Sequence, residues 1–341
     1  MPPDERSAAQ FLAEMVRGNQ LQQAVYVAAR LGVADRLADG PRSAERLAAD
    51  VGAHAPALYR LLRLLAGHGV FREDAGRRFA LTPVSELLRE GPRSVLPFAL
   101  WSGGVGYQAF GGLEHSVRTG EPAFEKIFGS EFFDYLDDHP ESGEVFDAMM
   151  ARHTGPIARA VAEFDFSGVE TVVDVGGGRG DLLTAVLRRH PRLRGVLVDR
   201  PRVLDAARRA LDASGVADRC EAVSADILRE VPPGDAYILK SVLHGLSDED
   251  AAGVLAACRR AMRPDGVLLI VEFLVTSGGE PSPAKLMDLL MLVGCHGRER
   301  TEEEFADLLA ASGLRLAGVS AARHGYGLLE CRAAGANASG S

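Results

Sequence analysis

The chain has 341 residues and a formal net charge of −9 at neutral pH, a length that accommodates two or three domains with ample cores. Its acidic balance argues against a general binder of nucleic acids or of anionic membranes. No apolar run reaches the roughly 20 residues that span a bilayer, and the first residues lack the features of a signal peptide, so we expect a cytoplasmic protein without a membrane segment.

Residues 1–95 have the pattern of a winged-helix domain. Apolar side chains recur at helical spacing from about residue 11 to 37, two short helical stretches then meet at Gly52, and a short hairpin follows. The second stretch offers only Arg60 and Arg63 to a DNA backbone, and acidic residues flank it. We therefore expect this domain to form a homodimer or to support a substrate lid, with DNA binding as the weaker alternative.

Residues 96–166 are predicted to form a mostly helical linker and substrate-lid region. A glycine-rich patch interrupts it at 102–112, and no chemistry can be assigned to that patch. Phe146 and Met150 share a helix predicted over 140–159. Such a cluster is more often plain core, although methionine also suits the wall of an adaptable aromatic pocket.

From residue 167 to 335 strands and helices alternate, which predicts a doubly wound, Rossmann-like α/β domain, with 336–341 as a flexible tail. Its first strand, Thr171–Val175, is followed by glycines and by a helix predicted over 181–190. Uncovered backbone N–H groups at such a helix start hold polar or anionic ligand groups. The next strand ends at Asp199, a residue type that hydrogen-bonds a ribose diol. The domain therefore predicts a nucleoside-type cofactor site.

The spacing of the glycine turn distinguishes between cofactors. The turn reads Asp174-x-Gly176-x-Gly178-x-Gly180, and Asp181 stands where the dinucleotide fingerprint needs a small residue. The Asp174 carboxylate would repel a pyrophosphate but not a sulfonium cation. S-adenosylmethionine (SAM) is therefore the predicted cofactor. An NAD-dependent dehydrogenase is disfavoured, and a tight turn without a ligand is the alternative.

Cysteine and histidine usage gives no sign of a metal centre. The four cysteines lie far apart in the sequence without a Cys-x-x-Cys pair, and the nine histidines show no metal-ligand spacing. We therefore predict neither a disulfide framework nor a bound metal ion.

Polar residues stand at the ends of three later strands, where open α/β sheets bind their ligands. Asp226 could accept a hydrogen bond from an adenine amine, or be an ordinary loop acid. A strand predicted over 235–244 carries Lys240, which suits a ligand carboxylate or a neighbouring acid. The same strand ends at His244, which could take a proton near neutral pH or be a structural histidine. Glu272 ends the following strand.

Four stretches together resemble the SAM-dependent O-methyltransferases of the plant caffeate and bacterial polyketide-tailoring type, in which a winged-helix dimerisation domain precedes a class I methyltransferase domain. They are Asp174-Val-Gly-Gly-Gly-Arg-Gly, Val-Leu-His244-Gly-Leu-Ser-Asp-Glu-Asp, Asp288-Leu-Leu-Met-Leu-Val and Gly297-Arg-Glu-Arg-Thr-Glu-Glu-Glu-Phe. The resemblance covers nearly the whole chain. It implies a domain-entwined homodimer, SAM in the C-terminal domain, and a small aromatic hydroxyl substrate from antibiotic biosynthesis between the domains.

The resemblance also implies roles for single residues. The family's base falls on His244, with Glu272 and Glu299 as flanking acids that fix its tautomer while it deprotonates the acceptor for in-line attack on the methyl group. The family's other contacts fall on Asp199 (ribose), Asp226 and Ile227 (adenine side), Lys240 and Thr154 (methionine carboxylate), and Phe146, Met150, Leu290 and Met291 (pocket lining). With Asp174, Gly176 and Gly178 of the turn, they make up the predicted site.

The sequence departs from the family pattern directly after the base. Gly245 and Leu246 replace the usual Asp-Trp, so an aromatic wall of the adenine site and one hydrogen bond are missing, and 291–299 differs from the common Gly-Gly form. These departures leave room for a SAM-binding relative that catalyses hydroxylation, decarboxylation or cyclisation instead. A DNA regulator is the more distant alternative.

Overall fold

The computed structural model describes residues 5–91, 93–322 and 325–335, and the chain forms two compact units. The first unit comprises Met1–Gln108 and Pro140–Arg152, and the second comprises Ala109–His139 and His153–Ser341. The segment predicted as linker and lid, 96–166, is therefore divided between both units, and the predicted tail 336–341 lies outside the described residues. Within the described ranges, no helix combines the length and the apolar character needed to cross a membrane.

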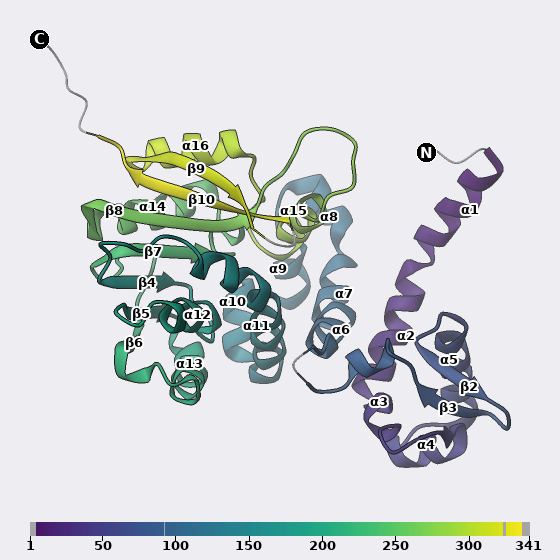
Figure 1. Cartoon of the computed structure of the whole chain (residues 1–341). Helices are drawn as coiled ribbons and strands as arrows, with labels where there is room; N and C mark the ends of the chain where they lie inside the picture. Colours follow the sequence, from purple (N-terminus) through teal and green to yellow (C-terminus); the bar gives the residue numbers. More distant parts are fainter. Residues whose placement is uncertain (1–4, 92, 323–324, 336–341) are drawn as a thin grey trace, which may run out of the picture. The chain divides into compact units, whose positions relative to one another are not determined.

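The first unit holds a small antiparallel sheet among helices (Figure 1). Its elements are α1 (Glu5–Val16), α2 (Gly18–Arg30), α3 (Val33–Arg36), β1 (Arg42–Ser43), α4 (Ala44–Val51), α5 (Ala55–Gly67), β2 (Phe71–Asp74), β3 (Arg78–Leu81), η1 (Ser85–Leu88) and α6 (Leu96–Gly103), with α7 (Val105–Phe110) at its boundary. The strand order is β1-β3-β2. Leu47, Leu62 and Phe79 are fully buried between α4, α5 and the hairpin. This is the winged-helix arrangement that the sequence predicted.

The glycine-rich patch begins where α6 packs against α2. An added Cβ at Gly103 would lie 2.2 Å from the Cβ of Tyr26, so only glycine permits this approach. The side-chain amides of Gln22 and Gln23 donate to the carbonyl oxygens of Ser102 (2.8 Å) and Gly103 (2.9 Å). This part of the patch therefore has a packing role.

The second unit is built on a seven-stranded sheet of order β6-β5-β4-β7-β8-β10-β9 (Figure 1). Its strands are β4 (Thr171–Val175), β5 (Arg194–Asp199), β6 (Cys220–Ser224), β7 (Gly234–Lys240), β8 (Met262–Phe273), β9 (Leu314–Ala321) and β10 (Tyr326–Ala333). Its helices are α8 (Leu113–Thr119), α9 (Ala123–Phe128), α10 (Phe132–Asp138), the second part of α11 (Pro140–Ala162), α12 (Asp181–Arg189), α13 (Pro201–Ser214), η2 (Ala217–Arg219), η3 (Leu243–Gly245), α14 (Asp248–Ala261), α15 (Pro283–Gly294) and α16 (Glu302–Ala311). Neighbours from β6 to β8 run parallel, and β10 is antiparallel to β8 and β9. The predicted Rossmann-like α/β fold is confirmed.

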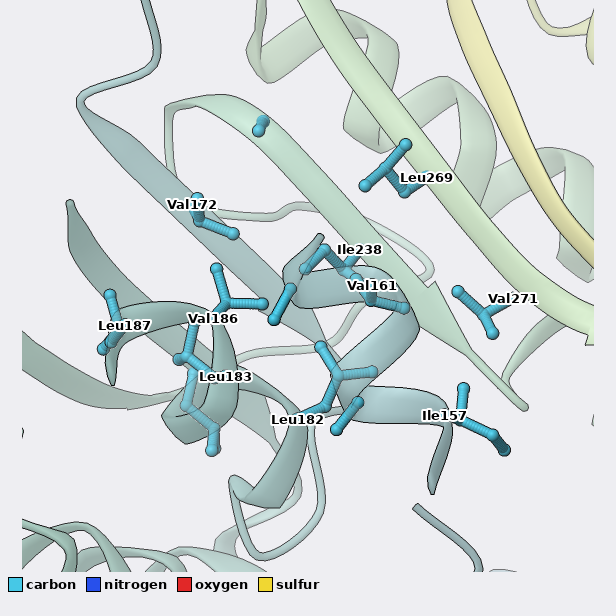
Figure 2. Packing of buried hydrophobic residues seen from close by; sticks show 14 of the residues in the cluster. Ile157, Val161, Val172, Leu182, Leu183, Val186, Leu187, Ile238, Leu269 and Val271 are labelled. Carbon is cyan, nitrogen blue, oxygen red and sulfur yellow. The ribbon is translucent and has the colours of Figure 1, made fainter. Parts of the chain in front are cut away.

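Strand alternation buries both faces of this sheet. On one face Val172, Ile238 and Leu269 pack against α11 and α12 (Figure 2). On the other face Val173 and its neighbours pack against α14 and α16. Asp174 alternates with Val173 and therefore belongs to the face of Val172, where a carboxyl group interrupts an apolar layer.

The strand order reverses between β4 and β7, which fixes where a ligand can bind. The chain passes from β4 outward to β5 and β6, and then returns to place β7 on the other side of β4. In open α/β sheets the crevice at such a switch point, beyond the carboxyl ends of the strands, holds the ligand. The glycine turn follows β4 at this edge, and Lys240 ends β7 beside it.

Candidate active site

The turn after β4 brings its backbone close to a buried carboxyl group. Gly176 has a φ of 71°, and an added Cβ there would lie 2.7 Å from a methyl group of Val242. Asp174 is 2% exposed, and its Oδ2 has no hydrogen-bond partner among the described residues. Burial and the neighbouring Asp199 raise the pKa of Asp174 to about 7. Such a carboxyl suits a ligand that brings a cationic or N–H group.

Asp199 ends β5 and closes the turn from the next strand. Its Oδ2 accepts a hydrogen bond from the backbone N–H of Gly178 at 2.7 Å. Asp226 and Ile227 follow β6, one strand further out, and Ile227 packs against the apolar layer on the α14 side of the sheet. The structure therefore places the predicted ribose and adenine residues at the carboxyl ends of neighbouring strands.

Lys240 stands between the glycine turn and the predicted base. It is 9% exposed, and burial lowers its pKa to about 8, against the opposing effect of Glu272 and Asp174. Its Nζ lies 5.9 Å from the ring centroid of Tyr326. Thr154 is also buried, on the part of α11 that belongs to the second unit.

The strand predicted over 235–244 is shorter in the structure, because β7 ends at Lys240. Ser241 takes a left-handed φ of 54°, which is strained for a residue with a Cβ. His244 then lies in the short 3₁₀ helix η3 and is 8% exposed. The predicted base is thus carried by a tight turn beyond the sheet rather than by the strand itself.

Glu272, near the end of β8, provides the physical reason for this turn. Its Oε1 accepts hydrogen bonds from the backbone N–H groups of Val242 and Leu243, at 2.9 Å each, and of His244 at 3.4 Å. Its Oε2 lies 3.6 Å from Nδ1 of His244 and has no hydrogen-bond partner among the described residues. Burial raises the pKa of this carboxyl. Glu272 therefore holds the backbone that carries the imidazole.

Glu299 holds the imidazole itself. Its Oε1 lies 2.7 Å from Nδ1 of His244, and its own backbone N–H donates to Oδ1 of Asp288 at 2.9 Å. Burial, and then the charge of Asp288, raise the pKa of Glu299 to about 8, while burial lowers the pKa of His244. When Glu299 is ionised and His244 is neutral, Nδ1 carries the proton and Nε2 is the basic atom. The arrangement can accept a proton at Nε2.

The same three side chains are close enough to be considered as metal ligands. The ligand atoms of His244, Glu272 and Glu299 lie within 4.8 Å of one another. However, Nδ1 is already hydrogen-bonded to Glu299, and Glu272 Oε1 already accepts backbone N–H groups. These contacts already engage the side chains with one another and with the backbone, and we assign no ion to the cluster.

The four residues predicted to line an acceptor pocket fall into both units. Phe146 and Met150 lie on the part of α11 that belongs to the first unit, where the Phe146 ring packs 5.1 Å from that of Trp101. Leu290 and Met291 are half-buried on α15 in the second unit. The structure therefore brings the cofactor and base residues of β4, β5, β7 and β8 to one sheet edge, whereas the four pocket residues belong to different units, two in each.

Three residues without a predicted role complete the base cluster. An added Cβ at Gly297 would lie 1.9 Å from the carbonyl oxygen of His244, so the two backbones touch there. Asp288 accepts from the backbone of Glu299, and Arg300 is fully buried beside it. Arg300 lies in one of the four stretches that carry the family resemblance, but most of its acceptors are more than 50 residues away in the sequence. The roles of Gly297 and Asp288 depend on contacts that no local sequence pattern predicts.

Two family models match the chain. A model described as the O-methyltransferase domain matches residues 110–315. A second model, the O-methyltransferase dimerisation domain, matches residues 13–91.

Curated relatives match over nearly the whole length. Phenazine O-methyltransferase PhzM of Lysobacter antibioticus is 46% identical over 325 residues, which cover 94% of this chain and 95% of that protein. Phenazine-1-carboxylate N-methyltransferase of Pseudomonas aeruginosa is 37% identical over 309 residues, which cover 90% and 92%. The similarity therefore extends to enzymes named for methylation at oxygen and at nitrogen.

Solved structures agree with these matches. The structure of LaPhzM has a TM-score of 0.92 at 45% identity and covers 95% of this chain and 99% of its own. NcsB1, an O-methyltransferase from neocarzinostatin biosynthesis solved with SAM and 2-hydroxy-5-methyl naphthoic acid, has a TM-score of 0.82 at 33% identity and covers 92% and 95%.

Proposed function

This chain belongs to the O-methyltransferase family and is a methyltransferase whose cofactor is SAM, and on that premise we propose that it methylates a hydroxyl group, in the simplest case a phenol, of a small aromatic natural product. The observation that carries the proposal is the buried His244, whose Nδ1 is held by Glu299 at 2.7 Å. When Glu299 is ionised, that contact leaves Nε2 as the atom that receives the acceptor proton. The phenazine and naphthoic acid for which two relatives are named or with which they were solved support an aromatic acceptor.

The residues at the switch point fit SAM. Asp174 has a buried oxygen without a partner among the described residues, which suits a cationic ligand. We assign Gly176 and Gly178 to the walls of the site, Asp199 to the ribose diol, Asp226 and Ile227 to the adenine side, and Lys240 and Thr154 to the amino-acid carboxylate. When bound, SAM supplies an electrophilic methyl group on its sulfonium sulfur.

The base cluster handles the proton of the acceptor. A phenolic hydroxyl like that of tyrosine has a pKa of about 10 in water, so a base is needed near neutral pH. His244 Nε2 takes or shares this proton, and the resulting imidazolium donates from Nδ1 to Glu299. The second carboxyl, Glu272, lies 3.6 Å from the same nitrogen and adds its charge when ionised. The acceptor oxygen then attacks in line with the breaking bond.

Alignment contributes more to the rate than the base does. Holding two reactants in a reactive geometry lowers a barrier by roughly 7–11 kcal/mol. General base catalysis worth roughly 10²–10⁴ in rate corresponds to about 3–5 kcal/mol. We assign Phe146, Met150, Leu290 and Met291 to the apolar lining that aligns the acceptor, because methionine adapts to flat aromatic shapes.

Transfer to nitrogen is the second candidate, favoured by the N-methyltransferase among the relatives. A neutral aromatic amine carries a lone pair and needs no base before it attacks. The intact contact between His244 and Glu299 therefore favours a hydroxyl acceptor. A non-methylating reaction on a SAM-bound scaffold would use neither the base nor a methyl acceptor.

The test is incubation of the purified protein with isotope-labelled SAM and paired panels of phenols and matched aromatic amines. We expect label in a phenol, with one S-adenosylhomocysteine formed for each acceptor that gains a methyl group. Label in the amines alone would move the assignment to nitrogen. An altered acceptor that carries no label, with SAM intact, would refute methyl transfer.

Replacement of the base separates its role from cofactor binding. We expect His244→Ala to lower turnover of a phenol at least about a hundredfold, with SAM affinity measured by calorimetry unchanged. The matched control is His68→Ala, at the exposed end of α5 in the first unit. Unchanged turnover in His244→Ala would remove His244 from the mechanism.

A further inference from the structure

A fully buried arginine lies behind the turn that carries the base. Arg300 has no solvent exposure. Its Nη1 donates to the carbonyl oxygen of Leu243 at 2.9 Å, and its Nη2 donates to that of Leu246 at 3.2 Å. These two carbonyls lie on either side of His244 in the sequence. One guanidinium therefore hydrogen-bonds the backbone on both sides of His244. We call residues 243–248 the base loop.

Asp248 completes the contact at the end of the base loop. Arg300 Nε and Nη2 donate to Oδ1 of Asp248 at 3.0 and 2.7 Å, where Asp248 opens α14. The backbone of Arg300 is fixed as well, because its carbonyl oxygen accepts from Val275 N–H at 3.1 Å. A planar fork with five N–H donors can serve these acceptors and the Arg298 carbonyl oxygen, at 3.3 Å, at once, whereas the compact ammonium of lysine cannot reproduce that geometry.

Consecutive residues therefore hold the base in two different ways. Glu299 bonds the imidazole of His244, and Arg300 bonds the backbone on either side of it. We propose that Arg300 is a positioning residue for methyl transfer, which clamps the base loop so that His244 keeps Nδ1 on Glu299 while Nε2 takes the acceptor proton. The inference rests on the proposed function, in which His244 is the base.

The positive charge of Arg300 also affects the pKa of His244. The charged and titratable groups that face His244 are Glu272 from β8, Glu299 beside Arg300, Lys240 from β7 and Arg300 itself. Burial lowers the pKa of His244, Glu272 raises it, and the Lys240 and Arg300 cations lower it as well. Arg300 also lowers the pKa of Glu299, against the effect of Asp288. Loss of the Arg300 charge therefore raises both pKa values, so the basic form of His244 appears only at higher pH.

Kinetics of Arg300→Lys and Arg300→Met with a phenol that the enzyme accepts test the clamp. We expect kcat to fall about tenfold in Arg300→Lys and about a hundredfold in Arg300→Met, with SAM affinity unchanged. The acid limb of the kcat–pH profile should move to higher pH in Arg300→Met and stay in place in Arg300→Lys, which keeps the charge. Arg298→Met is the matched control, because Arg298 also pairs with Asp248, at 3.1 Å, but its side chain is half-exposed and pairs with Asp248 and Glu304 rather than with the base-loop carbonyls.

A measurement without methyl transfer separates this inference from the proposed function. Nitrogen NMR of labelled histidine in the ligand-free protein reports the tautomer and the pKa of His244 directly. We expect the Nδ1–H tautomer in the unaltered protein at a pH where His244 is neutral and Glu299 ionised. Arg300→Met should show mixed tautomers and a higher His244 pKa. A protein that transfers no methyl group but shows these signals would refute the function and leave the clamp intact.

Asp248→Ala removes the exposed carboxylate that Arg300 bonds, and it tests the same clamp if Arg300→Met does not fold. Its control is Glu249→Ala, which removes another acid from the first turn of α14. The clamp predicts a lower kcat and mixed His244 tautomers for Asp248→Ala alone. The proposal is overturned if Arg300→Lys and folded Arg300→Met match Arg298→Met in kcat, pH profile and tautomer, or if Asp248→Ala behaves like Glu249→Ala.

Discussion

Three buried carboxyl groups of the second unit are only partly hydrogen-bonded. One oxygen each of Asp174, Glu272 and Glu299 has no hydrogen-bond partner in the described part of the chain. Burial raises the pKa of all three, to about 7 for Asp174 and about 8 for Glu299. Ionising such groups opposes folding, because a buried charge without a partner is costly. The site is therefore a local source of instability that a complementary ligand relieves.

Asp174→Asn should stabilise the ligand-free protein in a pH-dependent way. A carboxyl whose folded-state pKa is raised contributes stability below its unfolded pKa, and that contribution is lost as pH rises through the folded value. For Asp174 the window runs from 3.8 to about 7. We expect the gain in unfolding free energy of Asp174→Asn to be on the order of 2 kcal/mol larger at about pH 8 than at about pH 5.

Urea unfolding at the two pH values measures this difference, and calorimetry should show weaker SAM binding in the same variant. The control is Asp212→Asn, an exposed aspartate on α13. A gain that does not change with pH would mean that Asp174 ionises in the folded protein as it does in the unfolded chain.

At the level of elements, the site is held by two short segments pressed together. The base loop, 243–248, follows β7, and residues 297–300, which we call the base strap, precede α16. Contacts at Gly297, Glu299 and Arg300 join the strap to the loop. A capping box of Thr301 and Glu304 begins α16 directly after the strap. The start of α16 thus fixes one end of the strap that contacts the base loop.

Gly297→Ala should separate the strap from the base loop. The added methyl group would lie 1.9 Å from the His244 carbonyl oxygen, so one backbone must move. We expect a loss of about 1–3 kcal/mol of stability and a fall in kcat of about tenfold or more. Gly245→Ala is the control from the opposite side of the same contact, because its added Cβ meets no atom within 4 Å. Equal stability and kcat in the two variants would contradict the close approach.

At the level of the whole molecule, α1 carries an exposed apolar face in the described part of the first unit. Phe11, Leu12, Met15 and Val16 are between 57% and 71% exposed. Residues 13–91 match the family's dimerisation domain, and an exposed apolar stripe of this kind marks an interaction site. We therefore propose that this stripe contributes to a homodimer.

Leu12→Glu should weaken that homodimer, because it places a charge in a surface that association desolvates. We expect the dissociation constant from sedimentation equilibrium to rise at least about tenfold. Gln10→Glu adds the same charge on the opposite side of α1 and should leave association unchanged. An identical dissociation constant for both variants would show that the stripe lies outside the interface.

The sequence predicted regular elements better than the contacts between irregular ones. The β-branched run of β4, the glycine turn and the alternation of strands and helices specify the second unit, because each is a local pattern. The end of β7 was predicted wrongly, because Glu272 takes the N–H groups of Val242 and Leu243 from 29 or more residues away. Arg300 was likewise missed, since its acceptors lie more than 50 residues earlier. Long-range hydrogen bonds of buried charges leave no periodicity in a sequence.

The adjacency of Glu299 and Arg300 has a consequence for how enzymes of this kind can diversify. The base strap, residues 297–300, is contiguous, and α15, which carries Leu290 and Met291, precedes it as a separate helix. On the proposed assignment of Leu290 and Met291 to the acceptor lining, we expect chimaeras that exchange α15 between relatives to change the acceptor and to keep the proposed base. The donor helix must keep an aspartate at the position of Asp288, which secures the Glu299 backbone.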